Sequence, residues 1–253
     1  IINPIMYGTT DQAHYRFCDR QINDGTQSAH IFRKVPEEAL GLITLKIPGS
    51  FNMANALAAI SAAMELGIPF ETCQRTLNAF SAIWRRFERV GQWNGIEIIS
   101  DYGHHPTAVR LTLEAAREFF PNKKILLCFQ PHQHARTEAF FDEFVEALSQ
   151  ADGLVVPEIY RVEGRTEQEI VSSLGLVKAL QKKHPELSVH HAMTFDEAEE
   201  FLVRLVEQQP DCVIVIQGAG SIDELARKMT NKPPRPLQNL HISRHCERSF
   251  IIE

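Results

Sequence analysis

The stretch from residue 96 to residue 109, IEIISDYGHHPTAV, holds the pattern that decides the fold of this chain. A mainly apolar run at 96–100 leads into a polar loop at 101–105, and Pro106 then opens a segment with helical spacing. Proline is favoured in the first turn of a helix, because that turn does not need its N–H group. The stretch therefore predicts a strand, a loop and a helix in direct succession.

The same succession repeats along the rest of the chain. The sequence predicts strands at 96–100, 125–130, 153–160, 187–192 and 212–217, and helices at 106–120, 137–150, 167–183 and 195–208. Strands that alternate with helices form a mainly parallel sheet covered on both faces. Residues 85–230 are therefore predicted to form an α/β domain, in which ligands bind beyond the carboxyl ends of the strands.

The chain before residue 85 has a different rhythm. Short alternating pieces at 29–33 and 41–47 indicate strands, and an alanine-rich helix begins near Asn52 and stops at Gly67. A second helix is predicted at about 71–80. Because the segment 84–89 shows no period, we place a domain boundary there, so that 1–84 is a partial domain. The proline-containing segment 231–253 is predicted to be a disordered tail.

Composition excludes several classes of protein. The formal net charge of −6 argues against a nucleic-acid binder, since phosphate backbones recruit basic surfaces. No apolar run approaches 18 residues and no basic-plus-apolar leader opens the chain, so we expect neither a membrane span nor a signal peptide. The five scattered cysteines, without a C-x-x-C pair, suit a reducing cytoplasm. Since the first residue is Ile rather than Met, we expect the chain to begin inside a longer protein.

The loop at 101–107 carries the first group of candidate binding residues. It lies beside the free backbone N–H groups at the start of the next predicted helix, where an anion or nucleotide is stabilised. Asp101 could accept two hydrogen bonds from a ribose diol. The alternative is that Asp101 only caps the turn and that His104 and His105 are exposed.

The loop at 130–137 carries the second group, His132, His134 and Arg136. Its two imidazoles, together with the two of the preceding loop, could bind zinc, but no cysteine or acidic residue has matching spacing. An arginine at the start of a helix is better suited to clamp a carboxylate or a phosphate. The sequence therefore favours Arg136 as an anion-binding residue.

A glycine-containing turn and a pair of amides complete the candidates. The turn at 217–221, QGAGS, has one Gly-x-Gly, which is a weak dinucleotide signal, and a structural turn is favoured. Asn52 and Asn55 lie one helical turn apart at the start of the alanine-rich helix, so both amides could face one ligand such as adenine. The alternative, that Asn52 is only an N-cap, stays open.

Taken in order, these motifs resemble those of the Mur ligase family, and two of the loops are most similar to its alanine-adding member. The resemblance runs from about residue 40 to residue 229 and rests on PGSFNMANALAA (48–59), RRF (85–87), DYGHHPT (101–107), FQPHQHART (129–137) and QGAG (217–220). One such motif would be weak, whereas five in the same order are specific.

The resemblance implies a ligase of three domains: one for a UDP-sugar, a central ATPase and a C-terminal Rossmann-like domain. Residues 1–84 would then be the C-terminal part of the central domain. The implied reaction joins L-alanine to UDP-N-acetylmuramate in peptidoglycan precursor synthesis. It uses ATP and Mg²⁺ and passes through an acyl phosphate.

The resemblance also implies roles for residues on the nucleotide side. Asn52 and Asn55 would hold adenine, Asp101 the ribose, and Arg86 the phosphate region, where it would also serve catalysis. Tyr102 would lie in the same cleft, beside the amino acid.

On the amino-acid side, the resemblance implies that His104 and Arg136 act with Tyr102 on the incoming alanine. This chain departs from the family pattern at Gln133, where the family has a first arginine before Arg136. That departure puts the contacts to the acceptor in question.

Three other functions compete with this interpretation. Within the family, a ligase that recycles a murein peptide acts on the same sugar acid. Outside it, the chain could be a non-catalytic nucleotide-binding remnant of a ligase, or a Rossmann-type oxidoreductase, which the weak glycine pattern disfavours. A P-loop upstream would support a ligase over a remnant.

The sequence contains no G-x-x-x-x-G-K-[ST] stretch, and the family's P-loop and Mg²⁺ ligands would lie upstream of residue 1. Without the backbone cradle and lysine of a P-loop, the γ-phosphate is not positioned for transfer. We therefore expect the purified chain to show no ATP hydrolysis dependent on UDP-N-acetylmuramate and L-alanine. Sustained phosphate release on addition of both substrates would contradict this expectation.

Overall fold

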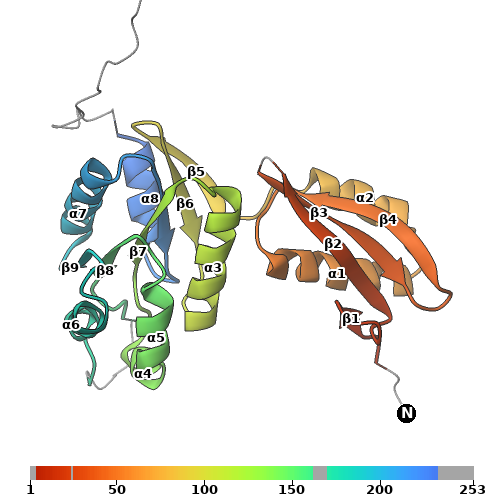
Figure 1. The fold of residues 1–253 in the computed structure, drawn as a ribbon, viewed down its shortest axis with the longest axis horizontal. Coiled ribbons are helices and arrows are strands. Elements are labelled where there is room, and N and C mark those ends of the chain that lie inside the picture. The colour runs from red at the N-terminus through yellow and green to blue at the C-terminus, as the bar shows by residue number, and fades with distance from the viewer. Residues whose placement is uncertain (1–3, 24, 162–169, 233–253) are drawn as a thin grey trace, which may run out of the picture.

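The computed structural model describes residues 4–23, 25–161 and 170–232, which form two lobes joined by the segment 80–87 (Figure 1). The predicted tail after residue 232 and the predicted helix start at 167–169 lie outside these residues. Within them, none of the helices is long and apolar enough to cross a membrane.

The N-terminal lobe is a four-stranded sheet with two helices against one face. Strands β2 (Tyr15–Asn23), β3 (Thr26–Arg33) and β4 (Glu38–Leu45) are antiparallel, and the short β1 (Tyr7–Gly8) pairs with β2 in parallel. Helices α1 (Ser50–Glu65) and α2 (Phe70–Ala79) agree with the two helices predicted from the sequence. Their apolar residues pack with the inward strand residues in one core that includes Ile31, Ile43 and Leu57.

The C-terminal lobe is built on a six-stranded sheet in the order β5-β6-β10-β7-β8-β9. All neighbours are parallel except β5, which runs antiparallel to β6 at the edge. The strands are β5 (Glu88–Trp93), β6 (Ile96–Asp101), β7 (Lys124–Phe129), β8 (Gly153–Pro157), β9 (Val189–Ala192) and β10 (Cys212–Gln217). The predicted α/β fold with a mainly parallel sheet is confirmed.

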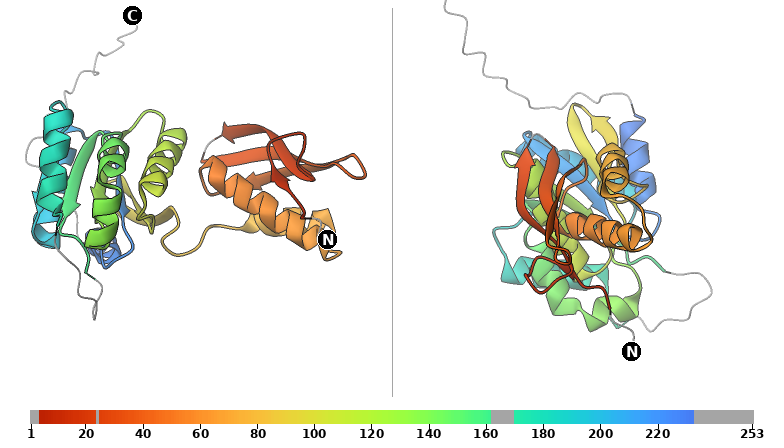
Figure 2. Two further views of the ribbon diagram at one scale, coloured as in Figure 1. Left: turned by 90° about the horizontal axis from the view of Figure 1, so that it is seen from below. Right: turned by 90° about the vertical axis from the view of Figure 1, so that its right-hand side faces the viewer.

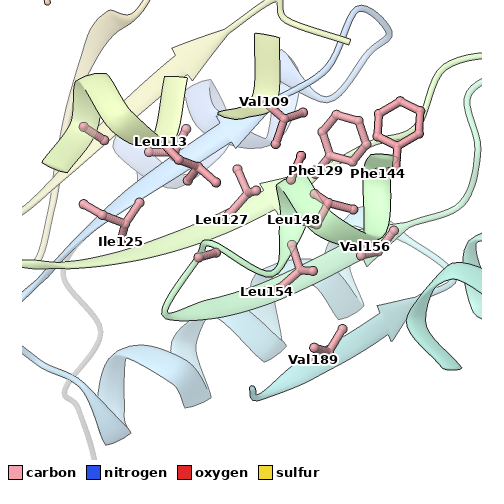
Figure 3. Close-up of a cluster of buried hydrophobic side chains, with 14 of the residues drawn as sticks. Val109, Leu113, Ile125, Leu127, Phe129, Phe144, Leu148, Leu154, Val156 and Val189 are labelled. Atoms are coloured by element: carbon pink, nitrogen blue, oxygen red, sulfur yellow. The ribbon is translucent and has the colours of Figure 1, made fainter. Parts of the chain in front are cut away.

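Helices cover both faces of this sheet. Successive strand residues point to opposite faces, so Leu127 and Val215 belong to one core, and Leu126 and Ile214 belong to the other. The first core, shown in Figure 3, is closed by α3 (Pro106–Phe119), α5 (Phe141–Leu148) and α6 (Ser173–Lys183). The second is closed by α7 (Phe195–Gln208) and α8 (Asp223–Thr230).

The strand order brings the three candidate loops together. Strand β10 lies between β6 and β7, and Gln217 is in register with Asp101 on one side and with Phe129 on the other. The loops that follow these three strands therefore start side by side at one edge of the sheet. Ligands of such sheets bind at the carboxyl ends of strands where the strand order changes, so a binding site is expected at this edge.

Three predicted elements differ from the structure. The helix predicted at 167–183 begins only at Ser173, since the described residues 170–172 are not helical. The predicted helix 137–150 is two helices, α4 (His134–Ala139) and α5, because Phe140 has φ −121° and ψ 29° and leaves helical geometry. The break coincides with a packing contact, since the Phe140 ring lies 4.5 Å from the His105 ring, centroid to centroid. The predicted strand 153–160 ends at Pro157, whose ring cannot donate to the ladder.

A strand was missed in the segment where no period was found. Glu88–Trp93 forms edge strand β5, and its pairing with β6 shifts register between Arg89 and Gly91. Immediately before it, Arg85 and Phe87 have φ values of 56° and 48°. An irregular edge strand that follows left-handed residues does not produce the alternation from which a strand is predicted.

The core predicts a clear stability difference between two leucines of the C-terminal lobe. Leu127 is fully buried, whereas Leu174 is 43% exposed. Leu127→Ala should lower the free energy of unfolding by about 2–5 kcal/mol, because it removes apolar burial and leaves a cavity. Leu174→Ala should change it by less than about 1 kcal/mol. Urea unfolding followed by fluorescence of the buried Trp93 measures both, and equal effects would contradict this packing.

Candidate functional site

A cleft of about 650 Å³ lies between the two lobes and is the main candidate site. Its walls are largely apolar and include Phe51 of α1, Ile83 of the joining segment and Leu111 of α3. Four predicted site residues line it: Asn52, Asn55, Arg86 and Asp101. The structure thus brings together residues from two lobes that are up to 49 positions apart in sequence (Asn52 to Asp101).

The two asparagines face the cleft from the first two turns of α1. The cap of this helix is Gly49, which makes no side-chain cap bond, so the alternative that Asn52 is the N-cap is wrong. Asn52 instead donates its amide to the carbonyl of Pro48 at 2.7 Å, and Asn55 donates to Oδ1 of Asn52 at 3.5 Å. These bonds orient the Asn52 amide, and the Oδ1 atom of Asn55 has no bond within the described contacts, so it can accept from a ligand.

Asp101 ends strand β6 and is 8% exposed. Its Oδ1 accepts from the backbone N–H of Gly103 at 2.8 Å, from Gln217 at 3.2 Å and from Thr112 at 3.3 Å. Its Oδ2 accepts from the backbone N–H of Phe87 at 2.9 Å. A carboxylate offers about four acceptor positions, so most are used and only Oδ2 keeps one for a ligand. The expectation of two bonds from a ribose diol is therefore reduced to about one.

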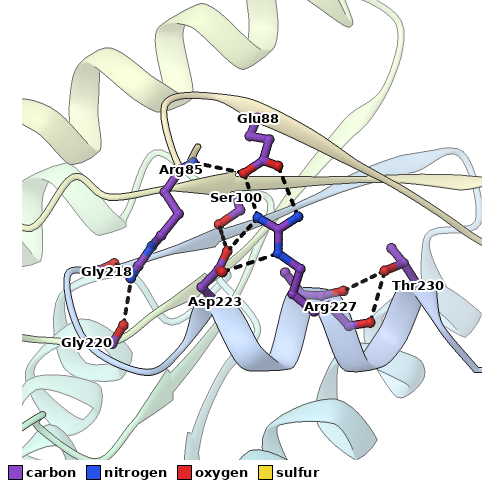
Figure 4. A network of polar contacts seen from close by, with 9 residues as sticks. Arg85, Glu88, Ser100, Gly218, Gly220, Asp223, Arg227 and Thr230 are labelled. Atoms are coloured by element: carbon purple, nitrogen blue, oxygen red, sulfur yellow. Dashed lines mark hydrogen bonds and ion pairs between the residues drawn. The ribbon is translucent and has the colours of Figure 1, made fainter. Parts of the chain in front are cut away.

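The adjacent residues Arg85 and Arg86 lie in different environments. Arg85 is 6% exposed and donates to the carbonyls of Gly218 and, at 2.9 Å, of Gly220, so it ties the joining segment to the turn after β10 (Figure 4). Arg86 is exposed and reaches the cleft. Both guanidinium groups lie over the Tyr102 ring, at 4.9 Å for Arg85 and 5.3 Å for Arg86. Tyr102 therefore contacts both guanidinium groups, and it is not among the described residues that line the cleft.

A partly buried network of charged side chains holds the backbone of Arg85 (Figure 4). Glu88 accepts from the backbone N–H of Arg85 at 2.9 Å and pairs with both terminal nitrogens of Arg227, at 3.0 and 2.6 Å. Hydrogen bonds from Arg227 keep the pKa of the Glu88 carboxyl below its usual range. Arg227 also contacts Asp223, which accepts from Ser100 at 2.6 Å. The start of β5 is thereby anchored to α8 and β6.

A cluster of rings and cations lies on the other side of Tyr102. The His104 ring is 5.4 Å from the Tyr102 ring and 5.5 Å from the His132 ring. Arg136 approaches Nδ1 of His132 at 3.2 Å. Burial, opposed in part by a bond to the Tyr102 carbonyl and aided by the charge of Arg136 and Arg86, lowers the pKa of His104. The lowered pKa favours the neutral imidazole. Because His104 is partly buried, the alternative that it is simply exposed is wrong.

Glycines at the end of β10 make room for this cluster. A Cβ atom on Gly220 would lie 2.4 Å from the Tyr160 ring, and one on Gly218 would lie 2.9 Å from the carbonyl of Gln130. Tyr160 in turn stacks on His132, with ring centroids 5.3 Å apart and planes 18° apart. The turn after β10 is thus a packing turn, as the sequence favoured, and it holds the position of a histidine.

The sequence did not identify Arg85 or Tyr160, although both are central to the arrangement. A pair of arginines was visible, but which of the two is buried depends on the left-handed backbone at Arg85. Tyr160 was placed inside a predicted strand, and its contact with His132 comes from an isolated bridge between the two segments. In the described parts of the chain, no group of three or more His, Cys, Asp and Glu side chains could hold a metal ion.

The family comparison agrees with the geometry. Residues 85–220 match the family model described as Mur ligase, glutamate ligase domain. This match spans more than half of the chain, and it includes β6, β7 and β10 with their loops. The chain belongs to the Mur ligase family.

Similar proteins match most of this chain, and each of them is much longer than it. The UDP-N-acetylmuramate--L-alanine ligase of Geobacter sp. (strain M21) is 36% identical over 223 residues, which is 88% of this chain and 47% of that protein. The one from Desulfatibacillum aliphaticivorans is 37% identical over 218 residues, covering 86% of this chain and 46% of that protein. The chain therefore spans about half the length of the curated relatives it matches.

Solved structures give the same result for the fold. The crystal structure of UDP-N-acetylmuramate-alanine ligase from Thermotoga maritima superimposes with a TM-score of 0.72 at 26% identity, covering 89% of this chain and 46% of that one. A Mycobacterium tuberculosis folylpolyglutamate synthase complexed with ADP and AMPPCP has a TM-score of 0.63 at 18% identity, over 88% of this chain and 49% of that one. The second likeness shows the fold alone.

Proposed function

We propose that this chain is the C-terminal part of an ATP-dependent ligase that joins L-alanine to UDP-N-acetylmuramate. The observation that carries the proposal is the cleft in which Asn52, Asn55, Arg86 and Asp101 meet from two lobes. Relatives named as UDP-N-acetylmuramate--L-alanine ligases support the choice of substrates. A cytoplasmic location is also proposed, since Cys18, Cys73, Cys128 and Cys212 are all free thiols.

The cleft suits a purine nucleoside. Phe51, Ile83 and Leu111 offer apolar contact to a flat base, and the amide of Asn55 can bind the polar edge of adenine. On the opposite wall, Asp101 Oδ2 has one acceptor position for a ribose hydroxyl. Arg86, whose guanidinium group lies over the Tyr102 ring, adds positive charge where phosphate oxygens would follow the ribose. Bound ATP would supply the phosphoryl group that activates the sugar acid's carboxylate.

The ring and cation cluster is proposed to hold the acceptor. Arg136 has a guanidinium fork that matches the carboxylate of L-alanine. Burial lowers the pKa of His104, and the neutral imidazole that this favours can hydrogen-bond without repelling an ammonium group. Gln133 has φ 69°, and its backbone bonds to Tyr160 and Thr137 hold it at the start of α4. Its neutral amide leaves the charge of Arg136 as the main attraction for the carboxylate.

The residues that line the cleft do not suit Mg²⁺ as they suit ATP. Asp101 is the single carboxylate among the described residues that line the cleft, and most of its acceptor positions are used. Mg²⁺ is usually bound by one or two carboxylates with phosphates and water, and the one remaining acceptor position of Asp101 is assigned to the ribose hydroxyl. The lining residues therefore leave no carboxylate for Mg²⁺, and its protein ligands are expected outside this chain.

The competing functions are less well supported. A murein peptide ligase from Psychrobacter arcticus has a TM-score of 0.60 at 19% identity, which shows the fold alone. The alanine-adding relatives are 36–37% identical. A non-catalytic remnant would retain the cleft without a functioning acceptor site, so nucleotide binding without any ligation in a full-length ligase that contains this chain would favour that function.

Asn55 gives the cleanest test of the nucleotide site. In a full-length ligase made by joining this chain to the preceding half of a relative, Asn55→Ala should raise the KM for ATP about tenfold, since it removes hydrogen bonds to the base. Asn122→Ala, outside the cleft, should leave it unchanged. Asp101 is a poorer choice because its oxygens also hold the backbone of Phe87 and Gly103. An unchanged KM for ATP in the Asn55 variant would refute this site.

Arg136 and Gln133 test the acceptor site. In the same full-length ligase, Arg136→Ala should raise the KM for L-alanine by at least about tenfold, because a charged hydrogen bond to the carboxylate is lost. Gln133→Arg should leave that KM unchanged or lower it. Arg110→Ala is the matched control, since Arg110 pairs with Glu114 on the surface of α3. If Arg136→Ala titrates like Arg110→Ala, the cluster does not bind the acceptor.

A further inference from the structure

The hairpin of strands β2 and β3 reaches across to the C-terminal lobe, and its tip faces the end of α3 (Figure 1 and Figure 2). At this contact, Arg20 of β2 forms a two-pronged ion pair with Glu118 of α3, with nitrogen–oxygen distances of 2.9 and 2.5 Å. The side chains are 16% and 31% exposed. A bidentate pair that is mostly shielded from water is stronger than an ordinary surface ion pair.

The backbone of β2 is shaped to direct Arg20 toward this partner. The β2–β3 register shifts between Cys18 and Gln21, and Asp19 within that shift has φ 54°. A bulge of this kind bends a strand and re-aims a side chain. A non-glycine residue in the left-handed region costs free energy, on the order of 1 kcal/mol, so the surrounding contacts must hold it there.

Glu118 is also placed against local preference. It lies in the last turn of α3, where the partial negative charge of the helix end disfavours a carboxylate. Isolated from Arg20, this position would favour a basic residue such as the neighbouring Arg117. The ion pair with Arg20 compensates for the unfavourable interaction of this carboxylate with the helix end. Glu118 therefore stabilises the contact between the lobes rather than the helix.

The ion pair is connected to the cleft through a buried amide. Arg20 donates its Nε to Gln27 at 2.6 Å, and Gln27 is fully buried. The Gln27 amide donates to the carbonyls of Ile47 at 2.6 Å and Gly49 at 3.0 Å, immediately before α1. All three guanidinium nitrogens are therefore engaged, and the chain of bonds ends at the helix start that carries Asn52.

We propose that Arg20, Gln27 and Glu118 form a clasp that sets the separation of the two lobes, and with it the distance between the asparagines and Asp101 across the cleft. Helix α3 contributes Ala108, Leu111 and Thr112 to the cleft and Glu118 to the clasp. Helix α1 contributes Asn52 and Asn55, and its start is held by Gln27. The clasp thus positions both walls from one end, and its three residues are positioning residues.

Small-angle X-ray scattering of this chain tests the clasp directly. Glu118→Arg and Arg20→Glu should each place like charges together, separate the lobes and increase both the radius of gyration and the maximum dimension. The double exchange, Arg20→Glu with Glu118→Arg, should restore much of the compact scattering. Glu114→Arg is the matched control on the same helix and should scatter like the parent chain.

Circular dichroism and thermal unfolding of the same samples show whether each lobe stays folded. Arg20→Lys is the substitute variant in case Arg20→Glu proves unfolded. It keeps the charge but loses the guanidinium fork, so it should give an intermediate increase in the radius of gyration. Unchanged scattering from folded single variants, or no rescue by the double exchange, would overturn the clasp. Its importance for ATP rests on the proposed function. Because scattering needs no nucleotide, expanded single variants with an unaltered KM for ATP would instead count against the nucleotide cleft.

Discussion

The carboxylate of Asp101 is the point on which the arrangement of the site depends. It receives hydrogen bonds from the joining segment through Phe87, from its own loop through Gly103, from α3 through Thr112 and from β10 through Gln217. Four parts of the chain, from 2 to 116 positions away in sequence, are thereby fixed to the end of one strand. A buried carboxylate with this many donors is stable only if all of them are in place, because an unpaired buried charge is costly. The cleft, the arginine pair and the start of α3 follow from this single centre.

Around Asp101, two pairs of residues of the same type divide a structural role from a proposed binding role. Arg85 points inward and closes the turn after β10, while Arg86 points to the cleft, and the Tyr102 ring lies against both. His132 is stacked on Tyr160, whereas the pKa of His104 is lowered by burial and by the charge of Arg136. Arg85 is buried and His132 is stacked, so each supplies a fixed surface beside the residue that is proposed to meet a ligand. This is how a lobe built mainly from apolar strands presents charged groups with definite directions.

Much of the fold could be predicted, because the relevant forces are local and periodic. The apolar runs before Asp101, before Gln130 and at 212–217 became three adjacent strands, and Pro106 began a helix as expected. The roles within the site were less accessible. Neither the choice between Arg85 and Arg86 nor the occupied oxygens of Asp101 leaves a signal in spacing. The ion pair of Arg20 and Glu118 joins residues 98 positions apart, and Glu118 lies against the preference of a helix end, so sequence reasoning passes over the pair.

Gly220 shows how a residue without functional groups can restrict a reactive part of the molecule. Any larger residue there would meet the Tyr160 ring, and the ring has His132 on its stacked side. The substitution would therefore displace the His132 imidazole beside Arg136 through the Tyr160 ring. In the proposed acceptor site, the range of permitted side chains is therefore set partly by a glycine that lies behind it. Changes to the pocket and changes to this turn would have to be made together.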